Sequence, residues 1–255
     1  MTHLRCAVYF SITGMILFEE LADRYFDLEC RSHALPEELK FISGIFRERN
    51  VSRCLDIGCG SGEHAGGLAR MGFQSSGQDL SPRMIEIARK KQPLCEFHLE
   101  DFSVSIKGGP YEGIFSLHGS FCYLLDNQSV LRAFQHAYSA LSPGGVFILE
   151  VWHFAPYRAI GRIPFRSYGG WPDVKAARRF QTISAQVHLI ELEYAFQFGE
   201  KRFLDLHTLR TYSLEEISAL AGSVGFLTEL ISGDFQGGPF QENKKSLLII
   251  FRKPR

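Results

Sequence analysis

The sequence has no excess of charge of either sign, since 28 Lys and Arg balance 28 Asp and Glu among its 255 residues. Without a field that attracts a polyanion, a nucleic-acid partner is disfavoured. Long apolar runs are also missing: the stretch from Cys6 to Phe18 is too short and too interrupted to span a bilayer, and no convincing secretory cleavage site follows it. We therefore expect a cytoplasmic protein that acts on neither nucleic acid nor membrane.

The cysteines form no C-x-x-C pair, and several lie inside apolar stretches, which is typical of reduced core thiols. They are Cys6, Cys30, Cys54, Cys59, Cys95 and Cys122. The sequence also contains no tight His/Asp/Glu cluster, no internal repeat and no low-complexity segment, so we expect neither a metal site nor a repeat protein. A composition of 45% hydrophobic and 22% charged residues is that of a globular protein.

Strand and helix patterns alternate through the first part of the chain. Two amphipathic helices are expected at Glu19 to Glu29 and Pro36 to Arg49, as an N-terminal cover over residues 1–50. Alternation after residue 50 indicates parallel βαβ units with right-handed crossovers. The expected strands are Arg53 to Ile57, Gln74 to Asp79, Leu94 to Leu99, Tyr111 to His118 and Val146 to Trp152; the expected helices are Glu63 to Met71, Pro82 to Lys91 and Asn127 to Leu141, the last stopped by Ser142-Pro143-Gly144-Gly145.

After Trp152 the pattern changes to prolines, glycines and aromatic residues, which we interpret as a loop over a site. Residues Phe180 to Phe198 and Arg202 to Tyr212 then alternate around a Phe-Gly-Glu-Lys turn and predict an antiparallel hairpin. Ser213 and Glu216 form a capping box for a helix from Leu214 to Val224. Strands at Phe226 to Ile231 and Leu247 to Phe251 complete a core of residues 51–152 and 213–255, with 153–212 as an insertion that covers the site.

A glycine-rich loop follows the first strand, at Gly58, Gly60 and Gly62. It places backbone N–H groups and a helix N-terminus against a ligand, as in dinucleotide sites. Glu63 beside the loop would repel a pyrophosphate, which disfavours a dinucleotide. Asp79 after the second strand can accept both hydroxyls of a ribose, so the edge of the sheet is interpreted as a nucleoside site.

A third carboxylate supports the same interpretation. Asp101 follows the third strand, where it can accept from an exocyclic adenine amine while Phe102 packs on the ring. Three such features at three consecutive strand ends are far stronger evidence than one glycine loop, because surface aspartates and a structural turn rarely coincide in this order.

The segments Leu55-Asp56-Ile57-Gly58-Cys59-Gly60-Ser61-Gly62, Asp79-Leu80-Ser81, Asp101 and Leu141-Ser142-Pro143-Gly144-Gly145 together resemble the class I S-adenosylmethionine-dependent methyltransferases, over roughly residues 50 to 152. The resemblance implies a Rossmann-like α/β fold with a seven-stranded, mostly parallel sheet in the order 3-2-1-4-5-7-6, helices on both faces and an inserted antiparallel lid. It also implies S-adenosylmethionine as cofactor and S-adenosylhomocysteine as product. The cofactor-binding residues implied are Asp56, Gly58, Cys59, Gly60, Gly62, Asp79, Leu80, Met84, Asp101, Phe102, Leu117, His118 and Gly119.

The tail from Arg210 to Phe226 is similar to that of small-molecule methyltransferases, including N-methyltransferases of amino sugars. This looser resemblance implies that the insertion builds the acceptor pocket and that Tyr25, in Asp23-Arg24-Tyr25-Phe26-Asp27, closes over the cofactor. The implied function is in-line transfer of a methyl group to an amine or hydroxyl of a small molecule. Ser116-Leu117-His118-Gly119 stands where an Asn-Pro-Pro-Tyr-like motif would indicate methylation of nucleic-acid bases, which argues against that activity.

Candidate catalytic residues are His118 and His153, which end the fourth and fifth strands, and Tyr25. His207 in the predicted hairpin is a further candidate base, and Tyr123 a further aromatic candidate; each of these side chains also has an ordinary packing role as the alternative. Two other functions stay open at this point: a cofactor-binding regulatory protein without transfer activity, and a nicotinamide-dependent oxidoreductase. A monomer and a homodimer are equally compatible with the sequence.

Overall fold

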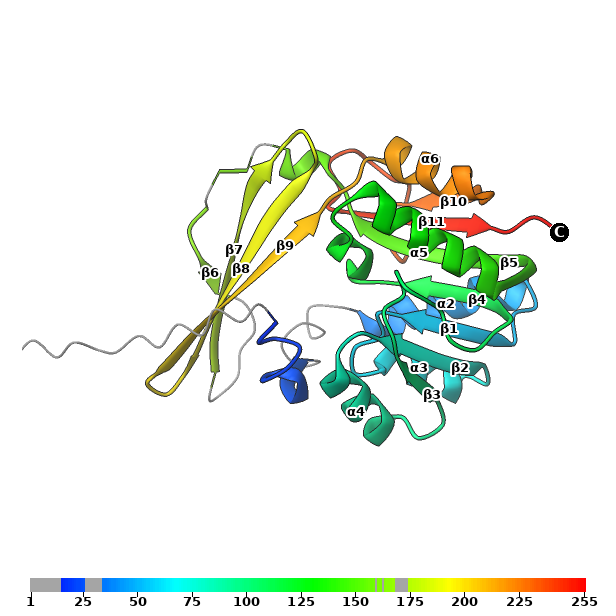
Figure 1. The fold of residues 1–255 in the computed structure, drawn as a ribbon, viewed down its shortest axis with the longest axis horizontal. Coiled ribbons are helices and arrows are strands. Elements are labelled where there is room, and N and C mark those ends of the chain that lie inside the picture. The colour runs from blue at the N-terminus through cyan, green and yellow to red at the C-terminus, as the bar shows by residue number, and fades with distance from the viewer. Residues whose placement is uncertain (1–14, 26–33, 159, 162, 168–173) are drawn as a thin grey trace, which may run out of the picture.

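The computed structural model describes residues 15–25, 34–158, 160–161, 163–167 and 174–255. A seven-stranded sheet forms the centre, in the order β10-β11-β5-β4-β1-β2-β3 (Figure 1). Its strands are β1 (Arg53–Ile57), β2 (Gln74–Asp79), β3 (Glu96–Leu99), β4 (Tyr111–Ser116), β5 (Leu141–Trp152), β10 (Leu227–Ser232) and β11 (Ser246–Arg252). The first five pair in parallel, while β11 is antiparallel to β5 and β10. The predicted Rossmann-like order is therefore confirmed.

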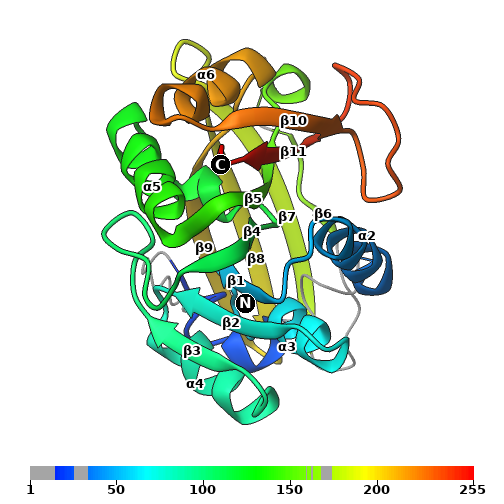
Figure 2. The same ribbon diagram turned by 90° about the vertical axis from the view of Figure 1, so that its right-hand side faces the viewer.

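Helices cover both faces of this sheet (Figure 2). They are α2 (Leu35–Glu48), α3 (Glu63–Arg70), α4 (Pro82–Lys91), α5 (Asn127–Ala140) and α6 (Leu214–Val224). On one face, Ile42 and Phe46 of α2 pack with Phe115 of β4. On the other, Phe134 of α5 packs with Phe147 of β5. Strands covered on both faces read as continuous apolar runs, which explains the runs at residues 146–149 in β5 and 247–251 in β11.

Local capping fixes where the helices begin and end. The Ser213 hydroxyl accepts from the Glu216 N–H at 3.2 Å, as the capping box predicts, and Gly225 ends α6 with a φ of 109°. The segment from Ser142 to Gly145 was expected as a free turn, but β5 already begins at Leu141. The four residues are an irregularity within that strand, because β4 pairs with Leu141 and resumes pairing at Val146.

A separate four-stranded antiparallel sheet stands beside the core and is called the lid below (Figure 1). It consists of β6 (Arg166–Ser167), β7 (Val174–Ser184), β8 (Leu189–Phe198) and β9 (Lys201–Arg210). The expectation of one long strand from Phe180 to Phe198 is wrong, since a turn at residues 185–188 divides it. That turn contains no glycine, proline or asparagine, and His188 supplies the positive φ of 56°. The β8–β9 turn was predicted correctly.

Residues 15–25 form a short segment between the lid and the core, called the N-terminal cover below (Figure 1). The expected helix from Glu19 to Glu29 is present as turns and a 3-10 helix, η1 (Ala22–Arg24), and residues 26–29 lie outside the described ones. The Ser81 hydroxyl at the start of α4 donates to the Phe18 carbonyl at 3.1 Å, and the Leu17 N–H donates to Asp205 of the lid at 2.7 Å. The cover is thus hydrogen-bonded to the core through Ser81 and to the lid through Asp205.

The four cysteines in the described part, Cys54, Cys59, Cys95 and Cys122, are free thiols, as expected. Cys6 and Cys30 lie outside it, as does the apolar stretch before Met15. No helix among the described residues has the length and apolar character needed to cross a membrane.

Candidate active site

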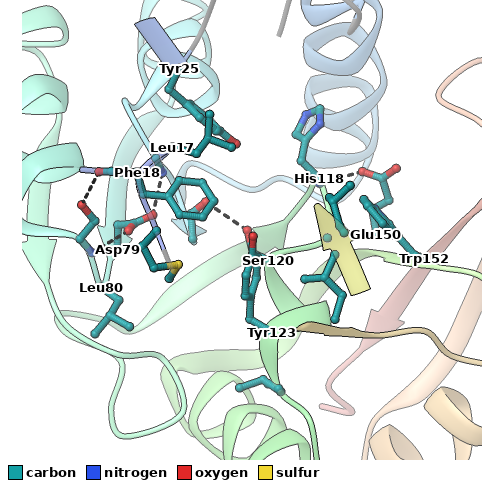
Figure 3. A pocket seen from close by; sticks show the side chains of 18 of the residues that line it. Leu17, Phe18, Tyr25, Asp79, Leu80, His118, Ser120, Tyr123, Glu150 and Trp152 are labelled. Atoms are coloured by element: carbon teal, nitrogen blue, oxygen red, sulfur yellow. Dashed lines mark hydrogen bonds between the residues drawn. The ribbon is translucent and has the colours of Figure 1, made fainter. Parts of the chain in front are cut away.

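A cavity of about 650 Å³ lies between the carboxyl ends of the parallel strands, the lid and the N-terminal cover. Core residues on its wall follow β1, β2, β3 and β4, and β5 adds Glu150 and Trp152. Figure 3 shows Asp79 on one side of this space and His118, Glu150 and Trp152 on the other, with Tyr123 between them. Of the expected cofactor-binding residues, those on its wall are Gly58, Gly60, Asp79, Leu80, Asp101, Phe102, His118 and Gly119.

The glycine loop after β1 brings backbone to the cavity. Gly58 has a φ of 75° and donates its N–H to the Gln78 carbonyl at 2.8 Å. Gly62 also has a positive φ, 79°, but a side chain there would meet the Phe97 ring at 2.7 Å rather than the cavity. Gly62 therefore serves the packing of α3 against β3. It is not among the described residues that line the cavity, where a direct contact with a ligand was expected.

Asp79 is held at the end of β2 by backbone donors. Its Oδ2 accepts from the Gly60 N–H at 2.8 Å and its Oδ1 from the Ser81 N–H at 2.9 Å. Burial raises the pKa of the Asp79 carboxyl above its usual value, although these N–H groups act in the opposite direction. A carboxylate offers about four acceptor positions, so each oxygen keeps capacity for a hydroxyl of a ligand.

Asp101 and Phe102 lie beside Asp79 on the cavity wall. The Asp101 Oδ1 accepts from the Ser103 N–H at 2.7 Å, which fixes the side chain in a turn after β3. The Phe102 ring stacks on Phe121, with 5.3 Å between ring centres. Each of the two side chains is thus held in place on the cavity wall by a contact of its own, and their role at an adenine stays a prediction.

The remaining expected cofactor residues are placed further from the main cavity. Asp56, Cys59 and Leu117 line an adjoining small pocket together with Tyr25, which lines both spaces. Burial raises the pKa of Asp56 to about 8, against the opposing charge of His118. Met84 is 1% exposed and packs with Ala22 and Ile87, so this side chain belongs to the contact between α4 and the cover.

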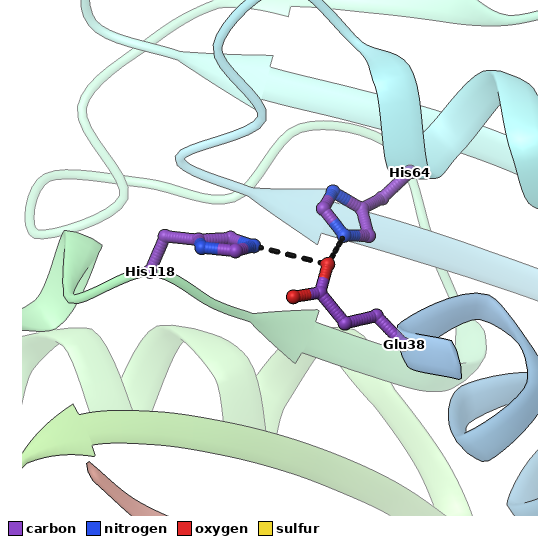
Figure 4. A group of neighbouring side chains, drawn as sticks. All are labelled: Glu38, His64 and His118. Atoms are coloured by element: carbon purple, nitrogen blue, oxygen red, sulfur yellow. Dashed lines mark hydrogen bonds and ion pairs between the residues drawn. The ribbon is translucent and has the colours of Figure 1, made fainter. Parts of the chain in front are cut away.

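Glu38, His64 and His118 come together from α2, α3 and the end of β4 (Figure 4). The Glu38 Oε2 lies 2.7 Å from His64 Nε2 and 3.3 Å from His118 Nε2. Burial opposes ionisation of Glu38, but the two imidazoles lower its pKa below the usual value. Burial likewise lowers the pKa of His118, and the carboxylates of Glu38 and Glu150 overcome this effect and raise it. The lowered pKa of Glu38 and the raised pKa of His118 both favour an ion pair between the two side chains.

The expectation that the chain has no tight His/Asp/Glu cluster was wrong, because the fold assembles one from residues 26 and 80 positions apart. Glu38 occupies the buried face of α2, four residues before Ile42. A charged residue in register with an apolar face is a signal for a buried ion pair that could have been read from the sequence.

The wall of the cavity on the lid side includes aromatic residues and one acidic residue, Glu150. Glu150 is 7% exposed and accepts from the His118 N–H at 2.8 Å. Trp152 stacks on Tyr157 with 5.7 Å between ring centres, and Phe180 and Tyr194 line the same space from β7 and β8. Glu150 and these rings had not been predicted as site residues, because their convergence depends on how the lid folds over β5.

The two other candidate histidines have different surroundings. His153 is 2% exposed, and its Nε2 lies 3.4 Å from Glu242 while its Nδ1 lies 3.2 Å from the Lys244 carbonyl. These contacts belong to the segment before β11, and His153 is not among the described residues that line the cavity. His207 lies behind the wall residue Tyr123, whose hydroxyl is 2.8 Å from His207 Nδ1.

Known proteins resemble this chain in both sequence and fold. Residues 54–145 match a family described as the methyltransferase domain. A protein of Geobacillus sp. (strain WCH70) that is named as a methyltransferase is 32% identical over 82% of this chain and 87% of its own length. A second relative, from Streptomyces venezuelae, is named dTDP-3-amino-3,4,6-trideoxy-alpha-D-glucopyranose N,N-dimethyltransferase; it is 25% identical over 78% of this chain and 86% of its own. A solved S-adenosylmethionine-dependent methyltransferase from Clostridium acetobutylicum shares the fold, with a TM-score of 0.81 at 20% identity over 93% of this chain and 99% of that one.

Proposed function

The chain belongs to the methyltransferase family, and from this premise we propose that it transfers a methyl group from S-adenosylmethionine to an amine nitrogen of a small-molecule acceptor. The observation that carries the choice of an amine is Glu150, a buried carboxylate that lines the cavity together with the aromatic residues Trp152, Tyr157, Phe180 and Tyr194. Each part of the proposal rests on a different group of wall residues.

The residues at the strand ends fit the cofactor. Asp79 offers spare acceptor positions to two ribose hydroxyls, and Asp101 offers one to an adenine amine beside the Phe102 ring. Gly58 and Gly60 leave room for the amino-acid end, since a Cβ on Gly60 would already lie 3.4 Å from the Tyr25 ring. His118 lines both pockets, and the raised pKa of its imidazole favours the charged form, which would attract the carboxylate of a ligand.

When bound, S-adenosylmethionine would supply a methyl group on a positively charged sulfur: a bond from the acceptor nitrogen to the methyl carbon would form as the carbon–sulfur bond breaks, S-adenosylhomocysteine would leave, and no enzyme nucleophile would be needed. The chain's own residues then align the acceptor and exclude water. Leu17, Phe18 and Tyr25 of the N-terminal cover lie on the cavity wall and are bonded to both sheets through Asp205 and Ser81. The cover therefore closes the reaction space on the side away from the core.

Glu150 and the rings favour an amine over a neutral hydroxyl. Methylation of an amine leaves a positive charge on nitrogen, and a desolvated carboxylate and aromatic faces both stabilise such a cation. Four relatives are named for transfer to nitrogen, among them the Streptomyces venezuelae protein and a glycine/sarcosine N-methyltransferase from Halorhodospira halochloris, and two are named for transfer to oxygen. Arg178 and Lys245 also line the cavity, which favours an acceptor that carries a phosphate or carboxylate as well as the amine.

The test is methyl transfer from radiolabelled S-adenosylmethionine to matched acceptors. We expect dTDP-3-amino-3,4,6-trideoxy-α-D-glucopyranose or glycine to be methylated in preference to the corresponding hydroxyl compounds. Glu150→Gln is expected to raise the KM for the amine about tenfold, the cost of about 1.4 kcal/mol for a lost charge contact. Tight binding of S-adenosylhomocysteine with transfer to the hydroxyl compounds alone would contradict the choice of an amine, and binding without transfer to any acceptor would favour the regulatory alternative.

A further inference from the structure

Tyr123, His207 and Asp205 form a continuous chain of polar groups that leads away from the cavity. Tyr123 ends η3 (Ser120–Tyr123) on the cavity wall, and its hydroxyl lies 2.8 Å from His207 Nδ1. The other ring nitrogen of His207, Nε2, lies 3.1 Å from Asp205 Oδ2. Asp205 and His207 are two residues apart on β9, so both side chains point to the same face of the lid, and both are fully buried.

The surroundings of Asp205 decide which nitrogen of His207 carries a proton. Burial raises the pKa of Asp205, but His207 and the backbone N–H groups of Met15 and Leu17 lower it below the usual value, so the carboxyl is ionised. The ionised carboxylate 3.1 Å away favours a proton on Nε2 electrostatically, since an unprotonated nitrogen would place two acceptors face to face, although this contact does not have the geometry of a hydrogen bond. Nδ1 of a neutral imidazole is then an acceptor, and the Tyr123 hydroxyl donates to it.

We infer that these three residues take up the proton that the acceptor must lose. This inference rests on the proposed transfer to an amine, because an amine bound as its ammonium ion has no lone pair until it is deprotonated. The ammonium N–H donates its proton to Tyr123 Oη while the hydroxyl passes its own proton to His207 Nδ1. The products are a neutral amine and an imidazolium that faces Asp205, so one positive charge moves from the substrate to His207 and none is created.

The same carboxylate joins this path to the N-terminal cover. Asp205 accepts from the Met15 N–H at 2.8 Å and from the Leu17 N–H at 2.7 Å. The Phe18 ring packs edge-on against both His207, at 5.6 Å, and Tyr123, at 6.0 Å between ring centres. The cover therefore packs over the buried part of the path, and in this proposal Tyr123, which lines the cavity, meets the substrate while His207 and Asp205 are positioning residues.

Four groups face the His207 ring: Asp205 on its own strand, Tyr194 on β8 at 5.2 Å, Tyr123 on η3 and Phe18 of the cover. Asp205 is the charged group among these four. Its carboxylate lies 3.1 Å from His207 Nε2, so an imidazolium formed at the end of the path would face a negative charge.

The tautomer of His207 tests the arrangement without any acceptor. In nitrogen-15 spectra at pH 8.5 with S-adenosylhomocysteine bound, we expect the His207 signal, identified by its loss in His207→Asn, to show a proton on Nε2 and a hydrogen-bonded, unprotonated Nδ1. Tyr123→Phe should shift the Nδ1 signal and leave Nε2 protonated. A proton on Nδ1 of neutral His207 would overturn the inference, whether or not the chain methylates an amine.

Kinetics test the proton transfer itself, with dTDP-3-amino-3,4,6-trideoxy-α-D-glucopyranose as acceptor. Tyr123→Phe is expected to lower kcat at pH 7 about 100-fold, with KM changed less than threefold. The loss should disappear toward pH 10, where the free amine binds directly. His207→Asn keeps an acceptor near Nδ1 but takes up no proton, so it should show the same recovery at high pH.

Tyr138→Phe removes a phenol of α5 outside the cavity and is the matched control, with an unchanged profile expected. A loss in Tyr123→Phe that is equal at every pH would overturn the inference and indicate a structural role. Binding of S-adenosylhomocysteine should be unchanged in every variant. A failure of the proposed function differs from a failure of the proton path, because in that case the wild type itself binds cofactor but transfers no methyl group to the amine.

Discussion

Ser120 occupies the space that a side chain on Gly58 would need. A Cβ placed on the glycine would lie 2.4 Å from the Ser120 Oγ and 2.5 Å from its Cβ. The Ser120 hydroxyl in turn lies 3.3 Å from the Gly58 carbonyl, so the glycine loop and the segment after β4 are fitted against each other. The loop's position over the cavity depends on this contact as much as on its backbone angles.

Gly58→Ala is therefore expected to destabilise the protein by about 2–3 kcal/mol, from the positive φ and the contact with Ser120 together. Binding of S-adenosylhomocysteine should weaken at least tenfold. Gly72→Ala is the control, because Gly72 also has a positive φ, 96°, but nothing lies within 4 Å of its Cβ position. Urea unfolding measures the stability of both variants, and calorimetry measures their affinity for S-adenosylhomocysteine. Equal losses of stability in Gly58→Ala and Gly72→Ala would refute a contribution from the contact with Ser120.

Asp79→Ala is expected to weaken binding of S-adenosylhomocysteine about 10- to 100-fold, since it removes an acceptor of roughly 1.5–3 kcal/mol from a buried position. Calorimetry measures this directly. Asp126→Ala removes an exposed carboxylate that caps α5 and should leave the affinity unchanged. If Asp79→Ala bound the nucleoside as tightly as the wild type, the assignment of the ribose end would have to be abandoned.

Tyr25→Ala is expected to speed dissociation of S-adenosylhomocysteine about tenfold, a change of about 1.4 kcal/mol. The Tyr25 ring lies against Gly60 and packs on Phe18, with 5.5 Å between ring centres, so its loss opens the cover beside the glycine loop. Stopped-flow displacement gives the rate. Tyr25→Phe keeps the ring and should dissociate at nearly the wild-type rate, whereas equal rates for all three proteins would show that the ring does not retain the ligand.

Glu38→Gln is expected to lower the free energy of unfolding most between about pH 4.5 and 6.5. His118 has a pKa above its usual value of 6.5, so its pairing with Glu38 stabilises the fold fully below that pH and progressively less as pH rises through the shifted pKa. Glu38 has a pKa below its usual value of 4.5, so its contribution is present above that pH and is lost in stronger acid. Breaking the buried pair should cost about 3 kcal/mol near pH 6 and clearly less at pH 9.

Urea unfolding at the two pH values measures this difference. Glu37→Gln, one residue earlier on the exposed side of α2, is the matched control and should change neither value. A loss for Glu38→Gln that is the same at pH 6 and pH 9 would show that the pair does not depend on the charge of His118.

The sequence predicts the core well because its signals are local. Strand β1, the glycine loop and the Ser213 cap each follow from residues a few positions apart, and the alternation predicts the parallel pairing, whereas the order of the strands was implied by the resemblance to methyltransferases. The lid is predicted less well. The turn at residues 185–188 carries no typical turn residue, so the alternation runs through it without a break.

The same distinction applies to the site. Asp79 and Asp101 are identified by their places after strands, and both lie on the cavity wall. Glu150 and the contact of Asp205 with Leu17 were not identified from the sequence. The contact joins residues 188 positions apart and exists only when the lid and the cover are folded together. Long-range packing, which no local pattern encodes, decides these parts of the site.

The lid leaves and rejoins the core at neighbouring points. His153 and Tyr212 form a parallel bridge, the Tyr212 N–H donates to the Trp152 carbonyl at 2.9 Å, and the Phe154 N–H donates to the Tyr212 carbonyl at 2.9 Å. An insertion whose two ends meet in this way can be lengthened, shortened or exchanged without moving the strands that hold it. The lid side of the cavity, where we propose that the acceptor binds, can therefore change while the strand ends proposed for the cofactor keep their positions.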